Sequence, residues 1–205
     1  MAWFQQLQSL CAAISYLVLN VTMTDEQRRR IVSRLNGRSR VDAFEAAKAV
    51  WEDSDERLER HLILTLKKGR RPFNRAAAAF AMQMVTTSRT IVALESTVKN
   101  KSERPRVRGE AAEALAHCHR KQSHNVLLTG LRDPNKDVRF WCAFALGEMA
   151  EKRAVPSLKR LVASDRRIVK GFYSVANEAA DAIENIQTEK VAHRRKNGCV
   201  FCVRA

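Results

Sequence analysis

The chain has 205 residues with 37 Lys or Arg against 22 Asp or Glu, which gives a formal net charge of +15. Such an excess favours an anionic partner, namely an acidic protein surface or a nucleic-acid backbone. Seven glycines form no phosphate-binding loop, and neither an H-E-x-x-H nor a G-x-S-x-G pattern occurs. We therefore expect no catalytic residues and no cofactor.

The first apolar stretch runs from Leu7 to Met23. It contains Gln8, Ser15 and Asn20, and no basic residue precedes it, so it lacks the features of a secretory signal or a membrane-spanning helix. It predicts a capping helix over Trp3–Asn20. We expect a cytoplasmic protein without integral membrane association.

A second helix is predicted over Asp25–Asn36. Thr24 and Gln27 have the spacing of a capping box, in which both side chains bind free N–H groups at the helix start. Gly37 follows as a helix stop. Residues 1–37 are thus predicted to form an N-terminal capping unit.

Five equivalent segments follow. At four, five and seven residues after each starting point, fourteen of fifteen positions are alanine, and Cys142 is the exception. Small residues at these spacings allow close helix packing. The period of 31 to 37 residues is typical of stacked helical arrays. The starting points are Asp42, Asn74, Val107, Val138 and Val175.

A leucine recurs twenty residues after each of the first four starting points, with Leu or Val four residues later. This spacing predicts a second helix in each unit. The predicted fold is all-α: one right-handed solenoid domain over 1–188 with about eleven helices. Its repeats lie near 40–71, 72–104, 105–135 and 136–173, with a half-repeat at 174–188 and a basic tail at 189–205.

The run from Asp133 to Arg139, followed by Ala143 and Leu146, resembles a HEAT repeat of the short type found in phycobilin-lyase-like bacterial proteins. The resemblance implies a protein-binding function, with enzymes a minority. It also implies structural roles, in which the Asp caps a helix and the Arg binds carboxylates or carbonyls of neighbouring units. The resemblance implies these structural roles for Arg108, Asp133, Asp137 and Arg139. Two units begin with Val-Arg, at Val107 and Val138, whereas the first two begin with Asp42-Ala43 and Asn74-Arg75.

Cysteine and histidine give no metal-site pattern. Cys118 and Cys142 fall on helix positions expected to be buried, which indicates reduced thiols. Cys199 and Cys202 form a lone C-x-x-C with only His193 nearby, where a zinc site needs four ligands. A metal or redox role and an incidental or partner-contacting tail both remain open, and we expect no metal. The other histidines are expected to be exposed at a turn: His117, His119 and His124.

Basic residues recur at one end of the predicted second helices. Lys67, Lys99 and Arg132 occupy the same repeat position and predict a row along one rim. Cations at helix C-termini also complement the helix dipole, which would explain them without a partner. We take the row as the candidate partner-binding surface. Five further residues widen it: Lys68, Arg70, Arg71, Lys159 and Arg160.

The favoured function is a non-catalytic scaffold that binds a protein or peptide along the solenoid, and we expect this partner to be acidic. The alternative is sequence-independent binding of nucleic-acid phosphates, which the net charge favours. Some HEAT-like proteins are glycosylases for alkylated DNA bases, which place aromatic residues and an acid in a cationic groove. Trp51 with Asp53 or Asp55 is the nearest match to that arrangement.

Overall fold

The computed structural model describes residues 23–52, 55–118 and 123–188. Within these ranges the chain forms ten α-helices and two short 3-10 helices, and its one β-type pairing is an isolated bridge between Ile168 and Ser174. The prediction of an all-α solenoid is confirmed. The helix expected over Trp3–Asn20 and the tail 189–205 lie outside the described residues.

The helices alternate between two roles. The first helices of the units are α3 (Arg40–Glu52), α5 (Pro72–Ala81), α7 (Pro105–Cys118), α9 (Lys136–Glu148) and α11 (Val175–Thr188). The second helices are α2 (Asp25–Leu35), α4 (Glu59–Lys68), α6 (Ser88–Lys99), α8 (His124–Gly130) and α10 (Val155–Ser164). The 3-10 helices η1 (Glu56–Leu58) and η3 (Lys152–Ala154) precede α4 and α10.

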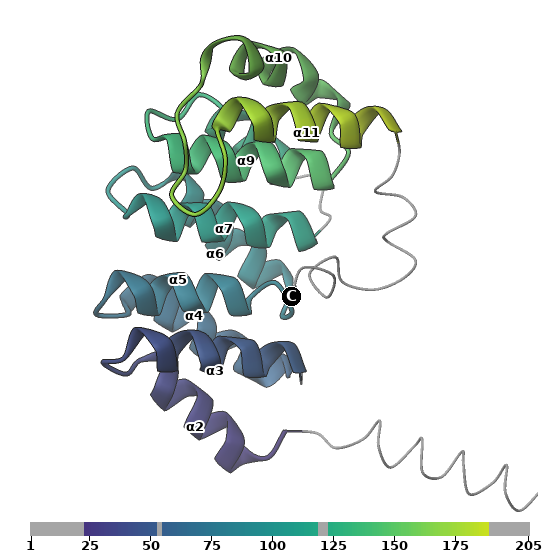
Figure 1. Ribbon diagram of the computed structural model, residues 1–205. Coiled ribbons are helices and arrows are strands. Elements are labelled where there is room, and N and C mark those ends of the chain that lie inside the picture. The colour runs from purple at the N-terminus through teal and green to yellow at the C-terminus, as the bar shows by residue number, and fades with distance from the viewer. Residues whose placement is uncertain (1–22, 53–54, 119–122, 189–205) are drawn as a thin grey trace, which may run out of the picture.

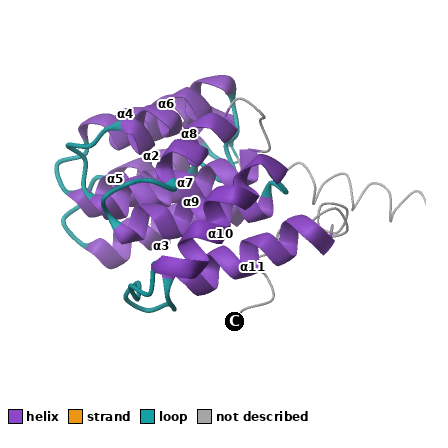
Figure 2. Cartoon of the chain, turned by 90° about the horizontal axis from the view of Figure 1, so that it is seen from above, coloured by secondary structure: helices purple, strands orange, loops and turns teal. Residues whose placement is uncertain are grey.

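These helices form two layers. In Figure 1, α3, α5, α7, α9 and α11 are stacked one above the next, each packed against its neighbour. Seen from above, α4, α6 and α8 lie on one side and α3 and α11 on the other (Figure 2). The second helices contact one another less extensively than the first helices do. None of the helices in the described ranges is both long and apolar enough to cross a bilayer.

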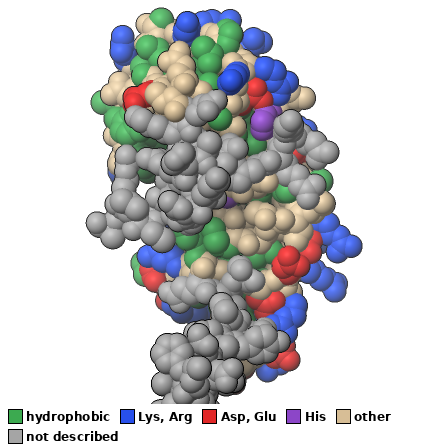
Figure 3. All heavy atoms as spheres, turned by 90° about the vertical axis from the view of Figure 1, so that its right-hand side faces the viewer, with side chains coloured by type: hydrophobic (Ala, Val, Ile, Leu, Met, Phe, Trp, Pro, Cys, Tyr) green, Lys and Arg blue, Asp and Glu red, His purple; other side chains and the backbone are tan. Residues whose placement is uncertain are grey.

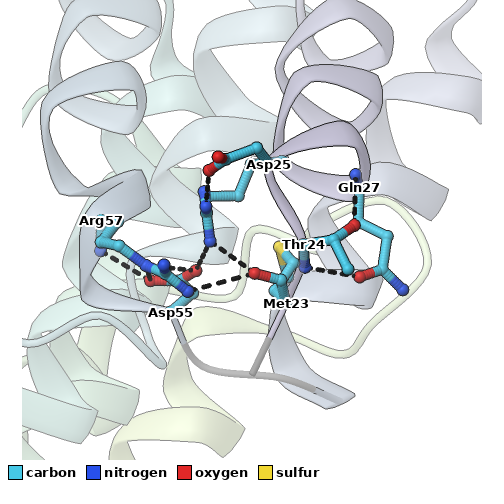
Figure 4. Close-up of polar contacts among 7 residues, drawn as sticks. Met23, Thr24, Asp25, Gln27, Asp55 and Arg57 are labelled. Atoms are coloured by element: carbon cyan, nitrogen blue, oxygen red, sulfur yellow. Dashed lines mark hydrogen bonds and ion pairs between the residues drawn. The ribbon is translucent and has the colours of Figure 1, made fainter. Parts of the chain in front are cut away.

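The capping box predicted at the start of α2 is present. Gln27 donates its backbone N–H to Thr24 Oγ1 at 3.2 Å, and Thr24 donates its own to Gln27 Oε1 at 2.7 Å (Figure 4). Both free donors at the helix start are thereby satisfied.

The alanine positions are the contacts between units. Five residues after the starting point, the alanine is fully buried in four units, Ala143 among them, but Ala180 on the last helix is exposed. This position therefore faces the following unit, and α11 is the last helix of the described residues. Helices α9 and α11 approach so closely that a Cβ on Gly147 would lie 2.8 Å from Ala182 Cα.

This difference gives a matched pair of variants for the packing. Ala143→Leu should lower the free energy of unfolding by about 1–3 kcal/mol, since the added atoms have no space between the helices. Ala180→Leu makes the same change at the exposed position and should alter it by less than about 0.5 kcal/mol. Urea unfolding followed by circular dichroism measures both. Equal effects of the two variants would contradict the packing described above.

Candidate functional site

Three arginines occupy the position directly after a starting point and form ion pairs inside the array. Arg75 binds Glu103 through two hydrogen bonds of 2.7 and 2.8 Å. The Arg108 guanidinium binds Asp133 at 3.2 and 2.5 Å, and that of Arg139 binds Asp165 at 2.7 Å. Arg108, Arg139 and the two aspartates are each less than 5% exposed. We call the three pairs the arginine ladder.

The arginine ladder also satisfies backbone carbonyls at the ends of second helices. Arg75 donates to Gly69 O at 2.8 Å, just after α4, and Arg108 donates to Val98 O at 3.0 and 2.8 Å in the last turn of α6. Arg139 donates to Asp133 O at 2.5 Å, after α8. Carbonyls in the last turn of a helix have no partner within the helix. Buried guanidinium groups supply those partners here.

Asp133 and Asp137 differ in their surroundings. Asp133 accepts hydrogen bonds from Arg108, Lys101 and the backbone of Asn135, and these bonds lower its pKa to about 2 against the opposing effect of burial. The N-cap of α9 is Asn135, whose Oδ1 accepts the backbone N–H of Asp137 at 2.9 Å. Asp137 Oδ1 is buried and has no hydrogen-bond partner in the part of the chain that the structure describes.

The lowered pKa of Asp133 predicts loss of stability in acid. A carboxyl whose pKa is lower in the folded than in the unfolded chain stabilises the fold above its unfolded pKa, near 4, and that contribution disappears as the pH falls towards 2. Asp133→Asn should lower the free energy of unfolding by about 3–5 kcal/mol at pH 7, because it breaks a buried pair. Between pH 4 and 2, the free energy of unfolding of this variant should depend less on pH than that of the parent.

Asp42→Asn is the matched control. Asp42 pairs with Arg34 at 3.3 Å, but both side chains are more than a third exposed, and exposed pairs contribute less than about 1 kcal/mol. Urea titrations at several pH values compare the two variants. If they behave alike, the arginine ladder contributes little to stability.

The predicted basic row has a different environment. Lys67 and Lys99 lie in the last turns of α4 and α6, and Arg132 directly follows α8. All three are exposed, and their side chains form no ion pair with any group in the described ranges. On the face drawn in Figure 3, Lys and Arg side chains gather at the upper end and along the right-hand edge, with Asp and Glu among them.

The residues expected to widen the row are less uniform. Lys68 and Arg70 are exposed beside Lys67, whereas Arg71 is half-buried before α5. Lys159 and Arg160 are exposed in the middle of α10 rather than at its C-terminal end, and Arg160 donates to Ser157 Oγ at 2.8 Å. The structure therefore brings Lys68 and Arg70 to the row, while the α10 cations occupy a different repeat position.

Two acidic residues at the other end of the units have a role that the sequence interpretation missed: Glu151 was not singled out, and Asp55 was considered only beside Trp51. Asp55 and Glu151 both lie thirteen residues after a starting point and cap η1 and η3. Arg57, two residues on, donates its backbone and side-chain N–H groups to Asp55, and Arg153 does the same to Glu151. These bonds are the main reason that the pKa of each carboxyl falls to about 2.

Each of these carboxylates also binds the preceding unit. Arg28 on α2 donates to Asp55 at 2.6 Å and to Met23 O at 2.5 Å (Figure 4). His124 at the start of α8 contacts Glu151 through Nδ1. His124 is therefore half-buried and paired, contrary to the expectation of an exposed turn histidine. The sequence signal for both carboxylates is the same: an acidic N-cap residue with an arginine two residues later.

The remaining sequence candidates lie as follows. The Trp51 ring stacks on Phe80 with centroids 5.0 Å apart, and Asp55 is paired with Arg57 and Arg28. Asp53, His119, Cys199 and Cys202 lie outside the described residues. Cys142 is a buried free thiol, and no metal-binding group of three His, Cys, Asp or Glu residues occurs in the described ranges.

A cleft of about 880 Å³ lies on the first-helix layer. Residues of α3, α5, α7, α9 and α11 line it together with the loop 165–174, which in Figure 1 descends from α10 past α9 before it reaches α11. This loop contains an insertion of about six residues, 166–171, which lengthens the spacing between the last two starting points to 37 residues. Gly171 allows the loop to turn, with a φ of +85°. Lys136 Nζ donates a hydrogen bond of 2.7 Å to Ile168 O.

Aromatic rings form the walls of this cleft. On the α9 side, Trp141 contacts Phe144 and Phe172 edge-to-face, with centroids 5.7 and 5.1 Å apart. The Trp141 ring lies against α7, where a Cβ on Gly109 would come within 2.6 Å of it. The other wall contains Phe44 and Phe80, whose centroids are 6.1 Å apart.

Carboxyl groups lie between the aromatic walls. Burial raises the pKa of Glu110 to about 7, and burial together with the nearby Glu110 raises that of Glu113 to about 8. Glu113 is 5% exposed and forms no ion pair within the described part of the chain. Cations lie at the cleft as well: Arg40, Arg106 and Lys170.

The raised pKa of Glu113 predicts loss of stability in base. Its folded pKa exceeds the unfolded value of 4.5, so its contribution to folding is most favourable below pH 4.5 and declines as the pH rises through 8. Glu113→Gln should therefore be more stable than the parent at pH 9, with a shallower decline between pH 6 and 9. Urea unfolding checks this against Glu26→Gln, an exposed carboxyl on α2. A slope unchanged by Glu113→Gln would show that the carboxyl is solvated.

Comparison with known families gives one match. Residues 91–174, from α6 to the loop before α11, match the family model described as HEAT repeats. The match supports a HEAT-repeat protein and includes the Arg108–Asp133 and Arg139–Asp165 pairs. HEAT repeats generally mediate protein interactions and are typically non-catalytic. A search of curated proteins gave no match.

Proposed function

We propose that the protein is a non-catalytic scaffold that binds an acidic segment of a partner protein along the basic row. The observation that supports this proposal is that two sets of cations, the arginine ladder and the exposed basic row, lie in different environments. Half-buried Arg75 and buried Arg108 already bind the carbonyls at the ends of α4 and α6. The exposed Lys67, Lys99 and Arg132 are therefore not required as hydrogen-bond donors to these helix ends and are available to a partner.

The repeat geometry favours an extended ligand. Solenoids bind partners through corresponding positions of successive units, and the row residues recur at intervals of 32 and 33 residues. Adjacent helices lie roughly 10 Å apart, so the three cations match carboxylates spread along a chain. On the resemblance of the Asp133–Arg139 run, we also infer repeats of the short, phycobilin-lyase-like bacterial type and a cytoplasmic site of action.

A second candidate is binding to the phosphate backbone of nucleic acids, which the net charge of +15 favours. Such binding needs no base recognition and weakens steeply as salt rises, because bound counterions are released. Affinity for random duplex DNA between about 50 and 200 mM salt separates the candidates. Binding that collapses over this range would favour nucleic acid, and its absence at the lowest salt would remove this candidate.

Charge reversal at the row tests the scaffold proposal. Lys67→Glu, Lys99→Glu and Arg132→Glu combined should weaken binding to an aspartate- and glutamate-rich peptide by at least several-fold at low salt. Stability should change little, because exposed charges contribute little to it. Fluorescence anisotropy of the labelled peptide measures the affinity.

The control is a second triple reversal at the opposite ends of second helices. Arg60 and Arg89 lie in the first turns of α4 and α6, Lys152 lies in η3 before α10, and all three are exposed without ion pairs in the described ranges. Reversing these to Glu changes the net charge equally. If both triple variants lose affinity to the same extent, binding follows net charge and the row is not the site.

A further inference from the structure

We propose that the cleft on the first-helix layer binds the guanidinium group of an arginine side chain presented by a partner protein. This site is separate from the basic row, and its ligand is positively charged, whereas the proposed ligand of the row is negatively charged. The proposal rests on three features of the cleft: aromatic walls, carboxyl groups without ion pairs, and a guanidinium of the chain itself held in the same manner.

The aromatic walls offer surfaces for a flat cation. Phe172 is 51% exposed on the loop 165–174, and its ring meets the half-buried Trp141 at 5.1 Å. Half-buried Phe144 and Phe80 complete the lining. A guanidinium stacks on aromatic faces and is less strongly hydrated than an ammonium group, so it loses less on entering such a cleft.

The carboxyl groups supply the countercharge. Asp137 Oδ1 is buried at the cleft without a hydrogen-bond partner in the described ranges, an arrangement that is unfavourable for a charged group. Glu113 is almost fully buried and has no ion pair in these ranges, and its hydrogen bond with the Gln83 side chain is neutral and leaves the carboxyl without a countercharge. A guanidinium presents five N–H donors in a fixed plane and can bind two such oxygens at once.

The chain itself already places a guanidinium in this chemical setting. Arg106 lies over the ring of Phe44 with its Cζ 5.5 Å from the centroid, and its Nη2 is 3.4 Å from Glu110 Oε1. One carboxyl of the cleft and one ring are thus used within the protein. Towards α9 the corresponding groups are Asp137, Trp141 and Phe172. Within the described ranges, no Lys or Arg forms an ion pair with Asp137.

Binding of a cation should be linked to ionisation of Glu113. Because the pKa of this carboxyl is raised to about 8, much of it is protonated at pH 7, and an incoming guanidinium favours the ionised form. The proton passes to solvent. Other charged groups facing the cleft are Arg40, Arg106, Glu110, Lys170 and Glu178, of which Glu178 accepts a hydrogen bond from Tyr173. Affinity should therefore rise between pH 6 and 8.5.

The test uses the full chain and three short peptides that differ at one residue flanked by glycine and serine: arginine, its neutral isostere citrulline, or lysine. Chemical shifts of the Trp141 indole N–H, followed by NMR during titration, report binding at the cleft. The arginine peptide should bind several-fold more tightly than either counterpart, and more tightly at pH 8.5 than at pH 6. Equal binding of citrulline or lysine would overturn the assignment to a guanidinium.

Variants locate the site. Asp137→Asn and Phe172→Ala should each weaken the arginine peptide several-fold, whereas Glu26→Gln on α2 should not. Phe172 lies on an exposed loop, so its removal leaves the helical array folded. If neither variant changes the affinity, the peptide binds elsewhere and the proposal fails. A single-stranded oligonucleotide that shifts Trp141 in place of the peptide would identify a nucleobase as the occupant and also overturn it.

The two proposals can fail separately. The triple reversal of Lys67, Lys99 and Arg132 should leave binding of the arginine peptide unweakened, and Asp137→Asn should leave binding of the acidic peptide unchanged. Loss of both ligands in either variant would show that unfolding or net charge is responsible.

Discussion

The close stacking of the first helices is the constraint on which the rest of the structure depends. Helices approach as closely as α9 and α11 do only where the facing residues are Gly and Ala, as at Gly147 and Ala182. Phe80 on α5 and the pair Trp141 and Phe144 on α9 lie on either side of α7, and the same close stacking brings them together around one cleft.

A strongly basic chain must also keep its cations from disrupting the fold, and this protein separates them by environment. Arg108 and Arg139 are buried, each with a carboxylate and a backbone carbonyl as partners. Their removal from water is offset by charge-assisted hydrogen bonds. Lys67 and Lys99 remain in water, where they contribute little to stability. The cations of the interior hold units together, and those of the rim are left for other interactions.

Much of the fold could be predicted because it repeats. The alanine spacing identified the first helices, and the Thr24–Gln27 pair identified the start of α2, since both signals are local. The partners of the arginine ladder were harder to predict. Glu103 and Asp165 lie at different distances from their arginines along the chain, 28 and 26 residues, so no fixed spacing reveals them.

The cleft was not predicted for a different reason. Its residues do share repeat positions: Phe44 and Phe140 lie two residues after a starting point, Glu110 and Trp141 three, and Glu113 and Phe144 six. The residue types at one position differ between units, so the repeat pattern does not mark these residues as one site. The insertion before α11 was visible in the sequence, but its fold over the first-helix layer depends on tertiary contacts such as that of Lys136 with Ile168. Glu113 carries no sign of its burial, because a glutamate at a helix surface position is ordinarily solvated.

The arginine ladder also determines where the array is most resistant to opening. Each unit of a solenoid is stabilised mainly by its neighbours, so the free energy of local opening follows the strength of each interface. At the ladder position the first and last units have Ala43 and Ala176 instead of arginine. We therefore expect the interfaces around α5, α7 and α9 to be more protected from hydrogen exchange than those of α2 and α3 at the N-terminal end, whereas α11 keeps its extensive contact with α9. A partner bound across the middle of the array would meet a nearly rigid surface and would lose little entropy in ordering it.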